Sequence, residues 1–329
     1  MIALSPPSED TNDEGDDDDI GSDVRVDLHW YTSDLCHCLI GIVLGRWDIR
    51  HLSNPGSQEE QIDPFASLSD YAKATLFGDA SDPATSTPKG YTLRIDSDGI
   101  IPDDPDHTDD IVRRVQEVLE LIWKDRADDI EKEACEILGV KELRDYFRKP
   151  GKGGFWDDHV SRYSKSRRKA PIYWLLQSSK KNYGLWLYYH RLDKDMLFKA
   201  RQNYVDPKIR LEQTRLDSLR SQKTALGADA KGAKKIDKDI EKQEALLGEL
   251  KDFAEKLERA AKLNFGNQEK LDSNVVYDPD LNDGVVLNIA PLWELLPWKE
   301  AKNYWEELLE GKYEWSSMGK LLRKKGLVK

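Results

Sequence analysis

The sequence predicts an α+β protein that is mostly helical. The chain has 329 residues, enough for two modest domains, and its 34% of charged against 39% of hydrophobic residues is typical of a solvated, helix-rich protein. Apolar residues recur at helical spacing in several segments, and two aromatic-rich runs lie near the middle of the chain. We therefore expect a helical part, an aromatic β-hairpin region, a projecting antiparallel helical hairpin of the coiled-coil type, and a C-terminal cap rich in tryptophan.

The N-terminal end is strongly acidic. Residues 1–30 contain ten Asp or Glu and one Arg, and the four Asp at residues 16–19 have Ser, Pro and Gly around them. Such a segment buries too little apolar surface to offset the entropy of ordering it. We predict that residues 1–23 form a disordered acidic tail.

The sequence argues against a membrane protein. Its longest apolar stretch, residues 39–44, is far shorter than the roughly 20 residues that a spanning helix needs. The acidic N-terminus also lacks the order of a signal peptide, in which basic residues precede apolar ones. We expect a cytoplasmic protein without membrane contact.

Residues 24–160 are predicted to be helical, with an interruption. Residues 35–44 are apolar enough for a buried helix that ends at Gly45. Residues 53–108 are dominated by Gly, Pro, Ser and Asp, with one strand-like run at residues 91–95, so we expect an irregular connector there.

Two helices are expected after this connector. Ile111, Val115, Val118, Leu119 and Ile122 share one helical face, and this run follows an Asp-rich cap region. A second helix over residues 130–138 is closed by Gly139, since glycine adopts the left-handed conformation that ends many helices.

Residues 161–207 are predicted to be a basic and aromatic β-hairpin region. The aromatic runs at residues 171–177 and 183–190 are separated by the polar residues 178–182, as in two strands joined by a turn. Aromatic side chains in such strands belong to the core roughly three times as often as they stack on bases. The side chains concerned are Trp174, Trp186, Tyr188 and Tyr189.

Residues 208–264 are predicted to be an antiparallel helical hairpin, and residues 265–329 a C-terminal cap. Leu216, Leu219 and Leu226 lead into a turn with two glycines, and a second helix follows in which apolar residues alternate at spacings of four and three. The expected seam of the hairpin consists of Leu216, Leu219, Leu247, Leu250 and Leu257.

The net charge of −12 argues against a nucleic-acid partner, but the average hides a basic segment. Residues 148–169 contain eight Lys or Arg and two Asp. Cations give sequence-independent affinity for phosphates, and planar groups can stack or wedge. The candidate DNA-binding residues are Arg148, Lys149, Lys152, Arg162, Tyr163, Lys165, Arg167, Arg168 and Lys169. From the residues alone, a solvated loop beside a core strand explains this segment equally well.

Several stretches in order carry a family resemblance: GIVLGRWDIR (41–50), IEKEACEILG (130–139), RDYFRKP (144–150), YSKSRRKAPIYW (163–174), WLYYHR (186–191), YVDPK (204–208), DLNDGV (280–285) and APLW (290–293). They resemble the C-terminal half of the BREX-type (PglX-type) large adenine-specific DNA methyltransferases of phage defence. The resemblance covers about residues 35–300. It implies a region that follows the catalytic domain and contributes DNA engagement and target recognition. The implied partners are duplex DNA, a catalytic methyltransferase domain or subunit, and other defence proteins.

The sequence departs from this family where methyl transfer is concerned. Such enzymes bind S-adenosylmethionine on a glycine-rich turn after a strand and hold the flipped adenine with an Asn/Asp/Ser-Pro-Pro-aromatic motif. Residues 5–8, Ser-Pro-Pro-Ser, lack the aromatic residue, and residues 54–56, Asn-Pro-Gly, lack the second proline. We therefore expect no catalytic residue and no cofactor in this chain, with S-adenosylmethionine bound by a catalytic domain that this chain does not contain.

Other candidate sites and functions are weaker. Cys36, His37 and Cys38 invite a metal hypothesis, but zinc ligands come as two separated pairs and the sequence offers no second pair, so we expect no metal. Residues 190–193, His-Arg-Leu-Asp, have no assignable nucleophile and are interpreted as structural. The alternative function is a protein-interaction adaptor whose hairpin and acidic tail engage partner subunits without touching DNA. An unrecognised enzyme is a third and weaker alternative.

Overall fold

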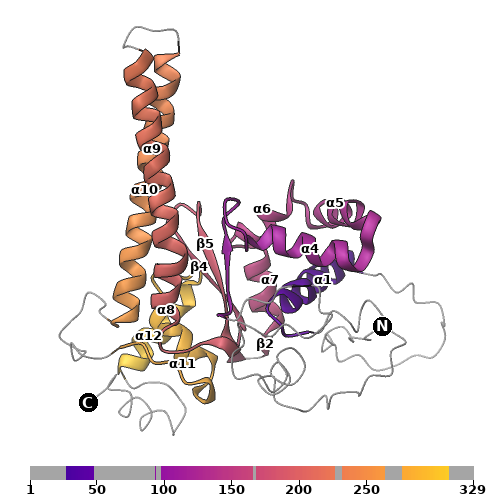
Figure 1. The fold of residues 1–329 in the computed structure, drawn as a ribbon. Coiled ribbons are helices and arrows are strands. Elements are labelled where there is room, and N and C mark those ends of the chain that lie inside the picture. The colour runs from indigo at the N-terminus through magenta and orange to yellow at the C-terminus, as the bar shows by residue number, and fades with distance from the viewer. Residues whose placement is uncertain are drawn as a thin grey trace, which may run out of the picture.

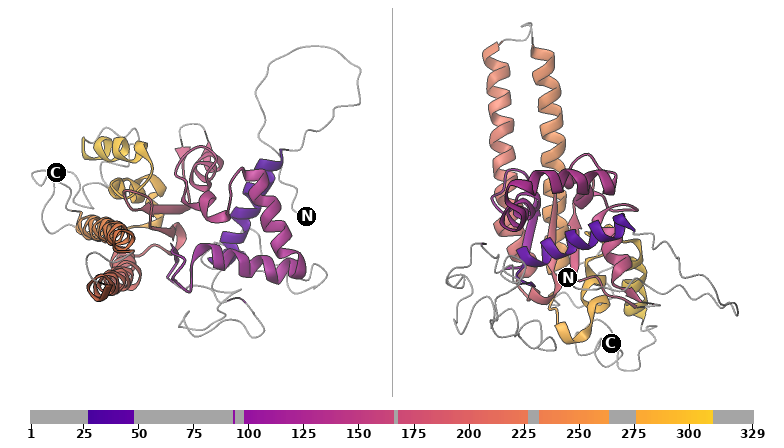
Figure 2. Two further views of the ribbon diagram at one scale, coloured as in Figure 1. Left: turned by 90° about the horizontal axis from the view of Figure 1, so that it is seen from above. Right: turned by 90° about the vertical axis from the view of Figure 1, so that its right-hand side faces the viewer.

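A computed structural model describes residues 27–47, 93, 98–165, 168–226, 232–263 and 276–310. In this part of the chain helices surround a small antiparallel sheet, which confirms the predicted mostly helical α+β class. The sheet lies between two groups of helices (Figures 1 and 2). One group consists of α1, α4, α5, α6 and α7, and the other is the long pair α9 and α10. Helices α11 and α12 lie near the end of the long pair that is opposite to its projecting tip. The predicted acidic tail and the strand-like run at 91–95, apart from Leu93, lie outside the described residues.

The three-stranded sheet has the order β1-β5-β4 and is antiparallel throughout. Strands β4 (Tyr173–Gln177) and β5 (Gly184–Tyr188) form the predicted hairpin, and Trp174 pairs with Leu187 in its register. Because helices cover both faces, successive residues of each strand are buried instead of alternating with exposed ones. The prediction that these aromatic residues belong to the core is confirmed, since Trp174 and Trp186 are fully buried.

Strand β1 (Ile100–Asp103) corrects one prediction. Residues 53–108 were expected to be an irregular connector, yet residues 100–103 pair with β5 and are buried. The sequence gives only a weak indication of this strand, because the strand has four residues, contains a proline and runs directly into an Asp-rich loop. Pro102 is tolerated because β1 lies at the edge of the sheet, where a strand residue can do without its N–H.

Three predicted helices of the N-terminal part are confirmed. Helix α1 (Leu28–Val43) begins earlier than expected, because the Asp27 carboxylate caps it by accepting from the Trp30 N–H. Helix α4 (Ile111–Trp123) is capped by Asp110, which accepts from the Arg113 N–H. Helix α5 (Ala127–Leu138) ends at Gly139, whose φ of 69° is the left-handed value predicted for its terminus.

Two shorter helices and a small ribbon complete this part. Helices α6 (Leu143–Arg148) and α7 (Phe155–Arg162) are joined by a tight loop. A Cβ on Gly154 would lie 2.1 Å from the Lys149 carbonyl oxygen, so only glycine permits this approach of the two backbones. Strands β2 (Ser164–Lys165) and β3 (Arg168–Lys169) pair just beyond α7.

The helical hairpin consists of α9 (Asp206–Leu226) and α10 (Ala233–Ala261), and it projects beyond the rest of the molecule (Figure 1). The ion pairs Arg220–Glu244 and Lys223–Asp237 join residues in opposite order along the helices, so the helices are antiparallel. Of the predicted seam, Leu216, Leu247, Leu250 and Leu257 are buried, and Leu219 is half-buried. Helix α8 (Met196–Lys199) and a π-helical turn (Ala200–Val205) lead into α9.

The C-terminal part contains α11 (Val285–Ile289) and α12 (Lys299–Glu310). Its backbone is tied to the sheet, since the Gln177 N–H donates to the Leu295 carbonyl at 2.8 Å. Trp298 and Trp305 are buried in it. Single 3-10 turns lie at Lys124–Arg126, Tyr189–Arg191, Leu281–Asp283 and Ala290–Leu292. Within the described ranges, no helix combines the length and the apolar character needed to cross a bilayer.

Candidate functional site

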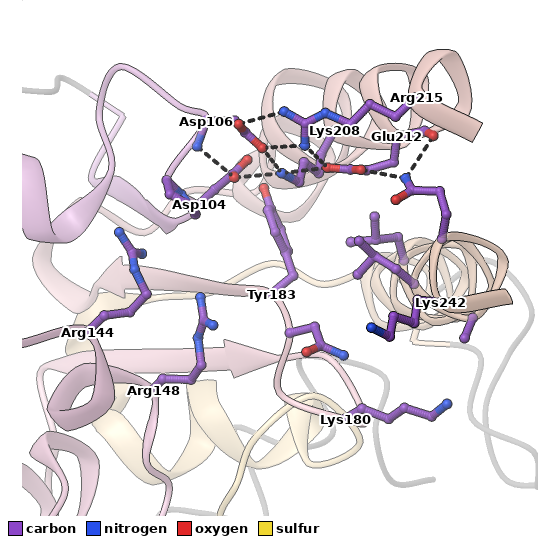
Figure 3. A pocket seen from close by; sticks show the side chains of 16 residues that line it. Asp104, Asp106, Arg144, Arg148, Lys180, Tyr183, Lys208, Glu212, Arg215 and Lys242 are labelled. Carbon is purple, nitrogen blue, oxygen red and sulfur yellow. Dashed lines mark hydrogen bonds and ion pairs between the residues drawn. The ribbon is translucent and has the colours of Figure 1, made fainter. Parts of the chain in front are cut away.

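A cavity of about 590 Å³ lies between the sheet and the helical hairpin (Figure 3). The loop after β1, helix α6, the turn between β4 and β5, and both helices of the hairpin line it. Its cationic lining residues are Arg144, Arg148, Lys180, Lys208, Arg215 and Lys242. Its acidic lining residues are Asp104, Asp106 and Glu212.

Helix α6 supplies two arginines that share one buried carboxylate. Arg144 and Arg148 are four residues apart and therefore lie on one face of the helix. Asp103 accepts from Arg144 Nη1 at 2.5 Å and from Arg148 Nε at 2.7 Å, and Asp110 accepts from Arg144 Nη2 at 2.7 Å. Burial alone would lower the pKa of Arg144, but the hydrogen bonds and charges of Asp110 and Asp103 outweigh it and raise that pKa. Both guanidinium groups are thus held in place by buried carboxylates.

Helix α9 carries the opposite wall, which is a network of ion pairs. Lys208 Nζ lies 2.7 Å from Asp104, 2.7 Å from Asp106 and 2.9 Å from Glu212. Arg215 bonds Asp106 at 2.7 Å, and its hydrogen bonds, followed by those of Lys208, lower the pKa of Asp106 well below its usual range. This network joins the loop after β1 to the hairpin and fixes one relative to the other (Figure 3).

Glu249 of α10 holds the turn between β4 and β5. Its carboxylate accepts from Ser178 Oγ at 2.5 Å, the Lys180 N–H at 2.8 Å and Asn182 Nδ2 at 2.6 Å. Glu249 is buried, which alone would raise its pKa, but these hydrogen bonds outweigh the effect and lower it. The backbone that carries Lys180 is therefore held in place by the hairpin.

Several polar groups of the cavity are not used by these contacts. Lys180 and Lys242 are exposed and make no ion pair with a described residue, and Arg148 Nη1 hydrogen-bonds none of them. Tyr183 is 1% exposed, and its hydroxyl has no hydrogen-bond partner in the described part of the chain. Its ring extends from the start of β5 toward Lys208 (Figure 3).

The charges of the site are arranged in depth. The carboxylates of Asp103, Asp110 and Glu249 stand behind the cavity wall and are buried, as is Glu212 in the lining. At the α6 wall the cation lies nearer the solvent, since the Arg148 side chain is 29% exposed against 2% for Asp103. At the α9 wall the order is reversed, since the Lys208 side chain is 9% exposed against 30% for Asp106. Six cations and six carboxylates balance in formal charge, and the exposed Lys180 and Lys242 present cationic groups on a site that is neutral as a whole. Such a surface can accept a ligand of low negative charge.

The structure divides the predicted DNA-binding residues between the two ends of α7. Arg148, Lys149 and Lys152 lie before this helix, Arg162 is its last residue, and the others follow it, eight residues or about 12 Å of helix away. Arg148 lines the cavity. Arg167 lies outside the described residues, as do the side chains of Lys165 and Arg168.

Most of the predicted residues with described side chains have partners within the protein. Arg162 forms an ion pair with Asp34 and lies over the Trp30 ring, 4.0 Å from its centroid. Lys169 pairs with Glu300 at 2.6 Å, and Tyr163 Oη accepts from Arg46 Nη1 at 2.7 Å. Lys149 and Lys152 are exposed and pair with no described carboxylate.

Several residues of the cavity were not predicted from the sequence. Lys180 was interpreted as part of a polar turn, Tyr183 as part of an aromatic strand, and Lys242 had no feature that set it apart. Arg144 did carry a signal, since its spacing of four from Arg148 within RDYFRKP places both on one helical face.

The Cys36-His37-Cys38 segment lies in α1, and its histidine has partners. His37 Nε2 lies 3.0 Å from His159 Nδ1, and Cys36 and Cys38 are free thiols. Among the described residues, no three His, Cys, Asp or Glu side chains are grouped to hold a metal ion.

Comparison with known proteins gives one informative match. No family model matches the chain. It is 29% identical over 222 residues to the adenine-specific methyltransferase BrxX of Escherichia coli O9:H4 (strain HS), a match that covers 62% of this chain. The same match covers 16% of that relative, so the chain spans about a sixth of its length. The predicted resemblance to BREX-type adenine-specific methyltransferases is confirmed in this general form.

Proposed function

We propose that this chain is the DNA-binding, target-recognition and scaffold part of an N6-adenine DNA methyltransferase in a BREX-type phage-defence system. The observation that carries the proposal is the match of 222 residues to BrxX. We further propose that these residues correspond to the C-terminal half of such enzymes, which follows the catalytic domain. The partners would be duplex DNA, the catalytic domain or subunit and other defence proteins.

Methyl transfer, in this proposal, takes place on another domain or subunit that binds S-adenosylmethionine. The glycine-rich loop at Gly151, Gly153 and Gly154 precedes helix α7, but it follows helix α6. A cofactor turn of this kind follows a strand instead, so that the helix N-terminus and the end of the strand meet at the ligand. The absence of an Asn/Asp/Ser-Pro-Pro-aromatic motif from the sequence supports the same division of labour.

The proposed contacts with DNA are electrostatic and start at the two ends of α7. Lys149 and Lys152 present their charges from the loop before this helix. The segment after it supplies Lys165, Arg167 and Arg168, with Arg162, Tyr163 and Lys169 supporting its base. Lysine and arginine contacts to phosphates give affinity that falls as salt rises, and they position the protein without reading sequence.

The α9–α10 pair is proposed to act as a coiled-coil arm of the scaffold. Its projection beyond the other elements leaves a long surface for the catalytic part of the enzyme (Figure 1). Leu226, at its far end, is 49% exposed. This feature also favours the second candidate function, an adaptor that binds partner proteins without DNA.

A salt titration of duplex binding tests the proposal. The purified chain should bind a short duplex with an affinity that falls linearly on a log-log salt plot, and it should transfer no methyl group from labelled S-adenosylmethionine to that duplex. Methyl transfer by the purified chain would refute the assignment of catalysis to another part. An absence of duplex binding at low salt would leave the adaptor as the function to pursue.

A further inference from the structure

We propose that the cavity between α6, the β4–β5 turn and the helical hairpin holds a phosphodiester group of bound DNA. This inference rests on the proposed function, and it adds a contact site that the basic segment alone does not include. Of the residues expected from the sequence to bind DNA, this cavity includes Arg148, and the other groups that make the site come from elsewhere in the chain.

The unused donors of the cavity suit a phosphate oxygen. Arg148 binds Asp103 through Nε and Nη2, which leaves both N–H groups of Nη1 available. Lys180 and Lys242, from the turn and from α10, add two ammonium groups without a described ion pair. Charge-assisted hydrogen bonds from such groups to phosphate are stronger than those between neutral partners.

Tyr183 gives independent support for a ligand. A buried hydroxyl without a hydrogen-bond partner is destabilising, and a phosphate oxygen in the adjoining cavity would supply the acceptor that Tyr183 lacks among the described residues. Burial raises the pKa of Tyr183 well above its usual value, so the hydroxyl keeps its proton and can donate at neutral pH.

The site is organised before any ligand arrives. Asp103 and Asp110 fix the guanidinium groups of α6, and Glu249 fixes the turn that carries Lys180. A ligand therefore does not have to order these backbone segments, which reduces the entropic cost of binding.

The charge of the site selects the kind of phosphate. Formal charges around the cavity balance, and Lys180 and Lys242 are its only cations without a described ion pair, so it can neutralise one or two negative charges. A phosphodiester carries one charge, whereas a nucleoside triphosphate carries about four. The volume of about 590 Å³ exceeds that of one phosphate and leaves room for the attached sugars. Lys149, next to Arg148 in sequence, would contact the same strand outside the cavity.

The test compares four forms of the full chain in duplex binding across a salt series. In the Lys180→Ala/Lys242→Ala variant, each lost phosphate contact should lower the salt slope by about one unit and affinity should fall about tenfold or more. Lys132→Ala/Lys194→Ala is the matched control, because it removes two exposed lysines that lie outside the cavity. The control should bind like the wild type.

Tyr183→Phe, the fourth form, separates binding from folding. It removes only a hydroxyl that has no described partner, so the melting temperature should stay the same or rise, while duplex affinity falls severalfold. If the wild type binds DNA and both cavity variants match it, the cavity proposal fails and the proposed function stands. If the wild type does not bind DNA, the proposed function fails, and the cavity proposal falls with it.

A mononucleotide distinguishes a free ligand from DNA. Deoxyadenosine monophosphate should compete with duplex only weakly, since it offers one phosphate and none of the contacts outside the cavity. Tight binding of this nucleotide that depends on Lys180 and Lys242, with unchanged duplex binding in the double variant, would assign the cavity to a free nucleotide and overturn the proposal.

Discussion

His159 Nδ1 lies 3.0 Å from His37 Nε2, and both imidazole rings are buried between α1 and α7. The neighbours determine which nitrogen carries the hydrogen. His159 Nε2 accepts from the backbone N–H groups of Ile172 and Tyr173, each at 2.9 Å, so Nδ1 must donate to His37. His37 then donates from its own Nδ1 to the Ser33 carbonyl at 2.6 Å. This chain of hydrogen bonds needs both histidines neutral, and it joins α1, α7 and the start of β4.

The first prediction is that acid destabilises the fold through this pair. Burial, followed by the charge of Arg162, lowers the pKa of His37 to about 3, and burial lowers the pKa of His159 well below its usual value. In the unfolded chain both pKa values return to about 6.5. A lowered pKa means that the unfolded state binds protons first, so stability is complete above pH 6.5 and is lost progressively as pH falls toward 3.

Urea unfolding at pH 7 and pH 5 measures this loss. At pH 5 the free energy of unfolding should be lower than at pH 7 by up to about 2 kcal/mol for each histidine. His37→Gln should make the pH dependence shallower, because it removes one of the two buried imidazoles. A wild-type pH dependence in His37→Gln would contradict the assignment.

The second prediction concerns Glu249, which connects the hairpin to the β4–β5 turn. Glu249→Ala leaves Ser178 Oγ and two backbone N–H groups without their acceptor, so the free energy of unfolding should fall by about 2–4 kcal/mol. Glu244→Ala is the control, because Glu244 is exposed and pairs only with Arg220 among the described residues, an ion pair worth less than about 1 kcal/mol. Chemical denaturation measures both variants, and equal losses would mean that Glu249 does not hold the turn.

The third prediction tests the packing of the helical hairpin against the rest of the described molecule. Leu250 of α10 is fully buried, so Leu250→Asp replaces a packed apolar side chain by a buried charge and should cost several kcal/mol. Leu226→Asp, at the exposed end of α9, should change stability by about 0.5 kcal/mol or less. Thermal melting followed by circular dichroism compares them, and an unchanged melting temperature for Leu250→Asp would refute the packing.

The elements that could be predicted from the sequence are those marked by a pattern of neighbouring residues. Helices α4 and α5 are marked by apolar periodicity, and their ends are marked by Asp110 and Gly139. The β4–β5 hairpin is marked by aromatic runs around a polar turn. Strand β1 was missed because four residues with a proline carry no period, and only its pairing with β5 makes it a strand.

The candidate site could not be predicted, because its contacts join distant parts of the chain. Asp103 and Arg148 are 45 residues apart, and Ser178 and Glu249 are 71 apart. The same limit applies to the basic segment, since composition counts charges but not their partners. Arg162 pairs with Asp34, which is 128 residues away in the sequence, and no local sequence pattern indicates this ion pair.

The last prediction separates cations that are free to bind DNA from cations that hold the fold. Lys149 and Lys152 are exposed and pair with no described carboxylate, so Lys149→Ala/Lys152→Ala should leave the melting temperature within a degree or two. The same double variant should weaken duplex binding and lower the salt slope by up to about two units, with a similar loss for any DNA sequence.

Arg162→Ala should behave in the opposite way. It leaves the Asp34 carboxylate without its cation and removes the packing on Trp30, so stability should fall by about 2 kcal/mol. Arg162 Nη1 already bonds Asp34 and its guanidinium carbon lies over the Trp30 ring, so the salt slope of the folded variant should change by less than one unit. Melting curves and duplex titrations of the two variants, measured side by side, test the distinction. A full unit of slope lost in Arg162→Ala, with unchanged stability, would show that this arginine contacts phosphate and that its ion pair with Asp34 is dispensable.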